Sequence, residues 1–332
     1  MKCYICLTDS IVTRNDYFDL LKVMLISARK NTSLHLVCLY DGKVNDPVYN
    51  LLKEFNVEII IHQLPYKKKL VEIYPHKWML ENLGKEIDYN RIFGTFMRME
   101  IPIIEKEEKY VLYSDIDVIF NSDILLEELP HPAYLAAAPE FECNVDNMEY
   151  FNAGVLIMNI QGMKIKYDKF ISKINNRERN VSGLFDQGYL NELCFSDMEL
   201  LPLEYNWKPY WGINNKAKLI HFHGMKPNSN LDEAGFATDE SFFRIAFDTN
   251  EKGYAGYVYY FTLFYDYLNR KEDPWLYNHL QDILNLYKQP SFLFPKYQKY
   301  EFKYQKYKRL YFLTLGISFF LLIMLCLILI LQ

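Results

Sequence analysis

The sequence predicts an α/β protein in which helices cover a mostly parallel sheet. Strand-like apolar runs alternate with helical stretches over the first 65 residues, an order typical of βαβ units. The chain has 332 residues, of which 50% are hydrophobic and 17% aromatic. This length and composition favour an ordered body of one large domain or two smaller ones, and they exclude a disordered chain.

The opening elements are expected in the order strand, helix, strand, helix, strand, over residues 2–9, 17–31, 34–42, 47–55 and 57–64. Ligands of such sheets bind beyond the carboxyl ends of the strands, where Thr8, Asp9 and Asp41 are expected. The chain has neither a G-x-G-x-x-G after the first strand nor a G-x-x-x-x-G-K-[ST]. Other residues are therefore expected to hold the phosphates of any bound nucleotide.

Charge and cysteine usage argue against a nucleic-acid-binding protein and against a zinc or redox site. The net charge is -5 and no basic stripe interleaved with aromatics occurs in the first 290 residues, so nucleic-acid binding is not expected. Cys3 and Cys6 form a C-x-x-C, but strand alternation points them to opposite faces and no second pair follows. We interpret the six cysteines as reduced core residues in a cytosol-like compartment rather than a zinc or redox site.

The end of the chain predicts a membrane anchor. From Leu310 onward no charged side chain occurs for over twenty residues, enough for a helix to span roughly 30 Å of hydrocarbon. The alternative, a buried core helix, is rarely apolar on every face. Five lysines and one arginine, interleaved with tyrosines, occur within residues 296–309, and by the positive-inside rule they place the preceding domain on the cytoplasmic side. No leader precedes the first strand, so we expect a single-pass C-terminal anchor.

Two acidic residues interrupt the apolar run "YVLYSDIDVIF" at 110–120. As strand residues i and i+2, Asp115 and Asp117 would project to the same side. Two close carboxylates in a partly buried site need a counter-charge, and a divalent cation with oxygen ligands is the natural one. The triplet alone is a weak signal, because D-x-D also occurs in solvated loops.

Polar groups further along the chain strengthen the metal interpretation. They lie in the segments 150–160, 183–191 and 206–228. His221 and His223 have strand spacing, and one of them could complete the coordination of a cation, although a structural role is the usual one for a lone histidine. Lys226 could neutralise a phosphate, and Gly224 could let the backbone approach it.

The ordered segments "FGTFMRMEIPIIEKEEKYVLYSDIDVIF", "FNAGVLIMN", "FDQGYLN" and "HFHGMKP" resemble the family 8 retaining glycosyltransferases, which include glycogenin and the bacterial lipopolysaccharide galactosyl- and glucosyltransferases. The resemblance covers about residues 1–230. It implies a GT-A, Rossmann-like nucleotide-sugar domain with a mixed, mostly parallel sheet, and retention of anomeric configuration. It also implies that Mn²⁺, or Mg²⁺, is bound by Asp115, Asp117 and His221.

The resemblance implies roles for further residues. Lys226, with Gly224 before it, corresponds to the lysine that contacts the donor diphosphate. The spacing of this motif is one residue shorter than in glycogenin-like members, and Asn228 replaces the usual tryptophan. The remaining donor and reaction-centre positions are Thr8, Asp9, Arg98, Asn152, Gly154, Asp186 and Gln187, with Tyr17 as a candidate for stacking on the base. We expect Asp186, Gln187 and Asn152 to be catalytic; a helix N-cap is the alternative for Asp186.

These expectations define four parts of the chain: a catalytic domain, an aromatic-rich helical extension, a basic juxtamembrane segment and a transmembrane helix, over residues 1–230, 231–295, 296–309 and 310–332. The expected function is transfer of a hexose from UDP-glucose or UDP-galactose to a glycan or lipid-linked glycan near the membrane. One alternative is a membrane-tethered, non-catalytic nucleotide-sugar-binding or scaffold protein. Another is an aspartate-nucleophile phosphohydrolase, which also uses D-x-D after an apolar strand, but such enzymes place it near the first strand.

Overall fold

The computed structural model describes residues 1–9, 15–84, 86–141, 143, 148–180, 185–227, 251–270 and 278. The chain forms two compact units, Met1–Leu276 and Tyr277–Gln332, and all elements below belong to the first. The predicted anchor at 310–332 and the basic segment at 296–309 lie outside the described residues. Within the described part, no helix combines the length and apolar character needed to cross a membrane.

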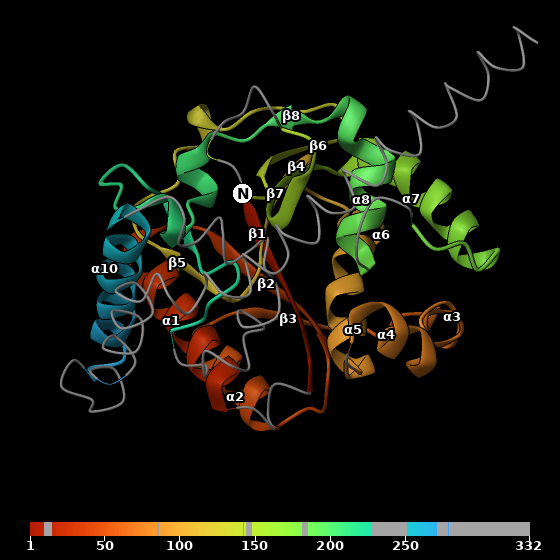
Figure 1. Ribbon diagram of the computed structural model, residues 1–332, viewed down its shortest axis with the longest axis horizontal. Helices are drawn as coiled ribbons and strands as arrows, with labels where there is room; N and C mark the ends of the chain where they lie inside the picture. The colour runs from red at the N-terminus through yellow and green to blue at the C-terminus, as the bar shows by residue number, and fades with distance from the viewer. Residues whose placement is uncertain are drawn as a thin grey trace, which may run out of the picture. The chain divides into compact units, whose positions relative to one another are not determined.

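A seven-stranded sheet lies at the centre of the first unit (Figure 1), in the order β3-β2-β1-β4-β7-β6-β8. Its strands in chain order are β1 (Lys2–Thr8), β2 (His35–Asp41), β3 (Glu58–Ile61), β4 (Tyr110–Ser114), β6 (Leu135–Pro139), β7 (Phe151–Asn159) and β8 (Glu199–Leu200). Strand β7 is antiparallel to both of its neighbours, and the other neighbouring pairs are parallel. The predicted mixed, mostly parallel sheet is confirmed.

A second, two-stranded sheet corrects one prediction. The apolar run at 110–120 was expected to be one strand, but it divides into β4 and β5 (Val118–Phe120). Strand β5 leaves the main sheet and pairs antiparallel with β9 (Leu219–His221). Val118 and Phe120 of β5 are buried in the core that also contains apolar side chains of the first helix. The segment 115–117 is therefore the connection between two sheets, not part of a strand.

Among the described residues, most helices flank the main sheet, and α10 lies outside α1 (Figure 1). They are α1 (Asn15–Asn31), α2 (Pro47–Glu54), α3 (Lys67–Ile73), α4 (His76–Leu83), α5 (Tyr89–Phe96), α6 (Ile101–Ile104), α7 (Ile160–Asn175), α8 (Phe185–Cys194) and α10 (Glu251–Tyr267). Helix ends follow known sequence signals: Asp46 accepts from the Tyr49 N–H at the start of α2, and Asn159 accepts from two N–H groups of α7. The first four expected elements of residues 2–55 are confirmed to within about two residues, whereas the third strand, expected over 57–64, is the shorter Glu58–Ile61.

Two hydrophobic cores form because side chains alternate across each strand. Tyr4, Val37 and Leu39 join one core with residues of α3 to α8. Cys3 and Ile5 join the other with residues of α1, α2 and β5. Cys6 packs against the first core, so the two cysteines of the C-x-x-C face opposite sides, and both have free thiols. The interpretation of these two cysteines as core residues is confirmed.

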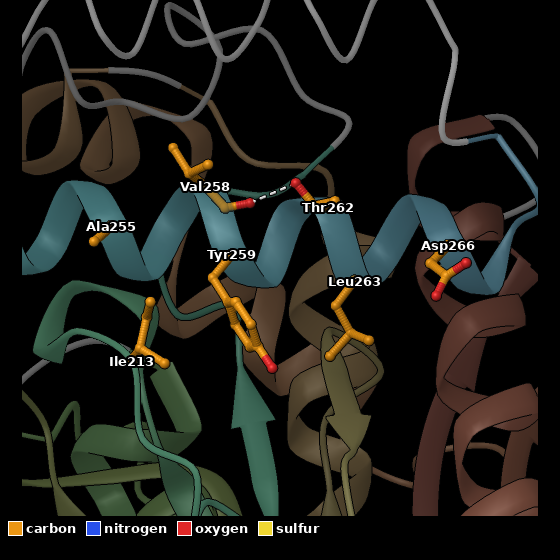
Figure 2. Close-up of a pocket in the computed structure, with 7 residues that line it drawn as sticks. All are labelled: Ile213, Ala255, Val258, Tyr259, Thr262, Leu263 and Asp266. Atoms are coloured by element: carbon orange, nitrogen blue, oxygen red, sulfur yellow. Dashed lines mark hydrogen bonds between the residues drawn. The ribbon is translucent and has the colours of Figure 1, made fainter.

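Helix α10 packs against α1 and the 3₁₀ turn η7 (Pro209–Trp211). Asn31 Nδ2 donates to the Tyr267 hydroxyl at 2.8 Å. A mostly apolar groove runs along α10, lined by Ile213, Ala255, Val258, Tyr259, Thr262, Leu263 and Asp266 (Figure 2). Figure 2 also shows the Thr262 hydroxyl donating to the Val258 carbonyl, at 2.7 Å. The groove contains none of the predicted site residues.

Candidate active site

The three predicted metal ligands converge between β4, β5 and β9. One ligand atom from each of Asp115, Asp117 and His221 lies within 4.8 Å of the others. His221 is the last residue of β9 and the register partner of Val118, so the pairing of β9 with β5 brings it beside the two aspartates. The aspartate turn is fixed by backbone bonds, from the Asp115 N–H to the Gly154 carbonyl at 2.7 Å and from the Phe222 N–H to the Asp117 carbonyl at 2.8 Å.

Asp117 is buried and ionised. Its Oδ2 accepts from the Lys226 ammonium, which also donates to the Phe222 carbonyl at 2.6 Å. Burial opposes the charge, but the Lys226 ammonium outweighs it and holds the pKa of Asp117 well below its usual value. Oδ1 is buried, accepts no hydrogen bond from any residue that the structure describes, and lies 3.4 Å from His221 Nε2.

These side chains fit a divalent cation. An orphaned, buried carboxylate oxygen is an acceptor that an additional group is needed to satisfy. Burial lowers the pKa of His221, although Asp117 opposes this shift, so the ring is neutral and has a lone pair to offer. Two carboxylates and one imidazole suit a divalent ion such as Mn²⁺ or Mg²⁺. The predicted metal site therefore passes a test of chemistry and geometry.

Arg98 joins the metal side of the site to Asp186. Its side chain is buried, with Nη2 3.2 Å from Asp115 Oδ1 and Nε 2.8 Å from Asp186 Oδ2. The guanidinium also donates to the Ala153 carbonyl and lies 4.5 Å from the centroid of the Tyr113 ring. Burial raises the pKa of Asp186, and Arg98 opposes that shift. Asp186 is the second residue of α8, so it is an ion-pair partner and not the cap of that helix.

The other residues predicted for the reaction centre lie on β7 and α8. Gln187 Oε1 accepts from the Ala153 N–H at 2.8 Å, which attaches the start of α8 to β7. At Gly154, an added Cβ would lie 2.2 Å from His221 Cε1. Only glycine at this position leaves room for the imidazole ring. Asn152 is buried and donates through Nδ2 to Glu140 Oε2 at 2.8 Å.

The predicted nucleotide residues lie at the expected strand ends. Thr8 ends β1, and its hydroxyl donates to the Asn90 carbonyl at 3.2 Å; Asp9 follows it in the chain. The Tyr17 ring has Arg91 5.9 Å from its centroid. Gly224 has a φ of 86°, a conformation that favours glycine. The contacts of these residues with a nucleotide sugar remain predictions.

Several buried polar residues next to the site were not predicted. Tyr113 donates to Asp115 Oδ1 at 2.5 Å, and Asn206 lies 2.9 Å from His221 Nδ1. Glu140 pairs with His223 at 3.1 Å; although burial opposes the shift, His223 and its other neighbours lower the pKa of Glu140 to about 2.

Lys208 is fully buried. It donates to the Pro139 carbonyl at 2.6 Å, and burial lowers its pKa to about 7. Asn206 and Lys208 belong to the segment "NWKPYW", in which polar residues stand among aromatics. That contrast is the only signal that could have indicated them.

Comparisons with known proteins identify a family for this chain. The sequence matches the model of "Glycosyl transferase family 8" over residues 10–230. A Haemophilus influenzae protein with a provisional glycosyltransferase name is 26% identical over 223 residues, which are 61% of this chain. The matched part spans 64% of that relative, less than two thirds of its length.

Solved structures of glycosyltransferases are similar to this chain at lower sequence identity. Galactosyltransferase LgtC, in complex with donor and acceptor sugar analogues, is 18% identical with a TM-score of 0.49, covering 74% of this chain and 95% of its own. Mouse xyloside xylosyltransferase 1 is 15% identical with a TM-score of 0.44, covering 66% and 96%. GlyE from Streptococcus pneumoniae TIGR4 is 22% identical with a TM-score of 0.43, covering 69% and 57%. Because these TM-scores lie below 0.5, the family of the chain is assigned from the sequence match over residues 10–230 and not from these structures.

Proposed function

Because the chain belongs to glycosyl transferase family 8, we propose that it transfers a hexose from a nucleoside-diphosphate sugar to a glycan acceptor, with a divalent cation and with retention of anomeric configuration. UDP-glucose and UDP-galactose are the proposed donors. The observation that supports this best is the convergence of Asp115, Asp117 and His221, next to a buried arginine that holds Asp186. In this proposal the aspartates and His221 face the cation and the donor diphosphate, and Asp186 faces the donor sugar.

The metal side would bind the diphosphate of the donor. Mn²⁺ or Mg²⁺, held by Asp115, Asp117 and His221, would neutralise the charge that develops on the departing nucleoside diphosphate. Lys226 adds a second positive charge there. Its ammonium pairs with Asp117 in this structure; once a cation occupies that carboxylate, Lys226 is placed to pair with a donor phosphate.

The opposite side would stabilise the sugar. Breaking a bond at the anomeric carbon gives an oxocarbenium-like transition state, which a nearby carboxylate or amide oxygen stabilises. Asp186 and Gln187 supply these oxygens. Arg98 holds Asp186 in place through Nε and contacts Asp115 through Nη2, so it fixes the sugar side relative to the metal side.

We propose a membrane-associated acceptor, such as a lipid-linked glycan. The support is in the sequence: the basic segment 296–309 and the uncharged segment from Leu310 would hold the catalytic domain at the cytoplasmic surface of a bilayer. A chain cut after Lys288 should lose transfer to an acceptor in vesicles but keep transfer to a soluble acceptor. Equal use of the vesicle acceptor by both chains would contradict the anchor.

The decisive experiment measures UDP release and thermal stability with a panel of nucleoside-diphosphate sugars, each with and without Mn²⁺. We expect one UDP-sugar to stabilise the protein only when Mn²⁺ is present and to be hydrolysed or transferred. Asp117→Asn, which keeps the side-chain volume, is the matched control. Binding without turnover would favour the non-catalytic scaffold, and no binding of any sugar would overturn the proposal.

A further inference from the structure

A chain of hydrogen bonds extends from the candidate metal ligand His221 to a carboxylate behind it. We propose that Asn206 and Asn152, in a fixed hydrogen-bond direction set by Glu140, hold His221 in the tautomer that offers Nε2 to a cation. This inference rests on the proposed metal role of His221. It assigns to Asn206 the part of a positioning residue, since Asn206 contacts the ligand histidine and not the substrate.

The chain is continuous and buried. His221 Nδ1 lies 2.9 Å from Asn206 Oδ1, Asn206 Nδ2 lies 3.0 Å from Asn152 Oδ1, and Asn152 Nδ2 lies 2.8 Å from Glu140 Oε2. Asn206 is 0% exposed and Asn152 is 2% exposed. Each amide group is thus desolvated and depends on its neighbours for hydrogen bonds.

Two fixed groups set the direction of the chain. The ionised Glu140 carboxylate can only accept, so Asn152 must turn its NH₂ toward Glu140. The Gly154 N–H can only donate, and it lies 3.0 Å from Asn152 Oδ1. Both groups demand the same orientation of the Asn152 amide, which therefore presents its oxygen to Asn206. Which atom of the Asn152 amide is oxygen and which is nitrogen is thus determined by its hydrogen-bond partners.

The direction then passes to the histidine. Asn206 must donate its NH₂ to Asn152, so its Oδ1 faces His221 and can only accept. Nδ1 must therefore carry the proton, and in a neutral imidazole the lone pair is then on Nε2. Nε2 is the nitrogen that lies 3.4 Å from Asp117 Oδ1. Metal-bound histidines are commonly oriented by a hydrogen bond of the other ring nitrogen in this way.

The backbone keeps Asn206 in register with His221. Asn206 ends the 3₁₀ turn η6 (Leu203–Asn206), and the next residue, Trp207, pairs with β9. The Trp207 N–H donates to the Leu219 carbonyl at 2.9 Å, and the His221 N–H donates to the Trp207 carbonyl at 2.8 Å. Gly154, by lacking a Cβ, leaves the ring its place between β7 and β9.

The first test is the tautomer itself. In metal-free, full-length protein with ¹⁵N-labelled histidine, above the usual histidine pKa of about 6.5, the ring nitrogens of His221 should report a protonated Nδ1 and an unprotonated Nε2. Assignment of the signal uses His221→Gln. A His221 ring protonated on Nε2 in the wild-type protein would overturn the proposal.

The second test is Mn²⁺ affinity, measured by titration with electron paramagnetic resonance and without any sugar. Asn206→Leu removes the acceptor and should weaken Mn²⁺ binding roughly 10- to 100-fold. Asn206→Asp keeps an acceptor for the Nδ1 proton and should bind Mn²⁺ within a few-fold of wild type. Asn206→Leu with wild-type affinity, or Asn206→Asp as weak as Asn206→Leu, would contradict the role.

The matched control is Asn159→Ala. Asn159 caps α7, so its loss should lower the stability of the fold and leave both the His221 tautomer and the Mn²⁺ affinity unchanged. A general effect of lost stability is thereby separated from a positioning effect. Neither test uses a donor or an acceptor. A protein that shows the expected tautomer and Mn²⁺ affinity but transfers no sugar would overturn the proposed function and leave this inference standing.

Discussion

Two buried carboxylates, Glu105 and Asp117, differ in what their oxygens contact. Glu105 precedes β4 at the amino end of the sheet, and among the described residues both of its oxygens have donor groups. It accepts from the Tyr4 hydroxyl at 2.7 Å and from two backbone N–H groups at 2.6 and 3.1 Å. Lys2 Nζ is 3.2 Å away.

Asp117 lies at the carboxyl end of the sheet and is satisfied only in part. One oxygen has a lysine ammonium, and the other accepts no hydrogen bond from the described residues. The pKa of each carboxylate lies below its usual value in spite of burial. A low pKa alone therefore does not distinguish a structural carboxylate from a ligand. The distinguishing feature is a buried acceptor oxygen that the described residues leave without a donor.

Neutralising Asp117 should give the largest effect on transfer. Asp117→Asn removes a ligand charge at nearly constant volume, and we expect transfer to fall by about 1,000-fold, equivalent to about 4 kcal/mol in the transition state. Circular dichroism should show an unchanged fold. The measurement is kcat/KM for UDP release at saturating Mn²⁺, and activity close to wild type would place the metal elsewhere.

An intermediate effect is expected where the site depends on the absence of a side chain. Gly154→Ala puts a methyl group 2.2 Å from His221 Cε1, so the ring must shift, and Mn²⁺ affinity should fall roughly 10- to 100-fold. Gly94→Ala is the control, because its Cβ would meet the Thr8 side chain at 3.5 Å, an ordinary contact. If Gly154→Ala and Gly94→Ala had the same Mn²⁺ affinity, the position of the His221 ring would not be important for Mn²⁺ binding.

The smallest effect on transfer is expected at Glu105. Glu105→Gln sets an amide NH₂ against existing donors and should reduce the free energy of unfolding by about 1 to 3 kcal/mol, with unchanged kcat/KM at a temperature where the variant is folded. If the folded Glu105→Gln variant lost transfer, Glu105 would not be a purely structural carboxylate, and its contrast with the proposed ligand Asp117 would fail.

Glu105 should also make the free energy of unfolding depend on pH. The donors around Glu105 lower its pKa from 4.5 to about 2. Its ionisation therefore stabilises the folded state above pH 4.5, and the contribution is lost as the pH falls from 4.5 toward 2. Denaturant unfolding at several pH values should show the stability difference between wild type and Glu105→Gln shrinking over this window. A difference that grew on acidification would show the sign to be wrong.

The sequence was most informative where a pattern is local. Strands and helices of residues 2–64 follow from apolar periodicity, and the two aspartates follow from charges that interrupt an apolar run. The break between β4 and β5 was not predicted, because the partner of β5 is β9, about a hundred residues later. A strand that changes its partner has the same apolar pattern as one that continues.

Residues behind the ligands were missed for a related reason. Asn206 contacts Asn152 across 54 residues of sequence and His221 across 15, and no local spacing marks it. Glu140 is likewise identified only by what surrounds it in space. Such residues act through partners that the fold brings to them, so they become visible only when the topology is known.

The division of the site between two sheets also bears on how the protein acquires its activity during synthesis. Asp117 and Lys226 are 109 residues apart, and His221 reaches the aspartates only when β9 pairs with β5. Contacts over such separations form late, after the loop between them has closed. A nascent chain that has left the ribosome as far as β7 would contain both aspartates but no ligand set. Affinity for the proposed cation would therefore arise only after β9 has been synthesised and has paired with β5.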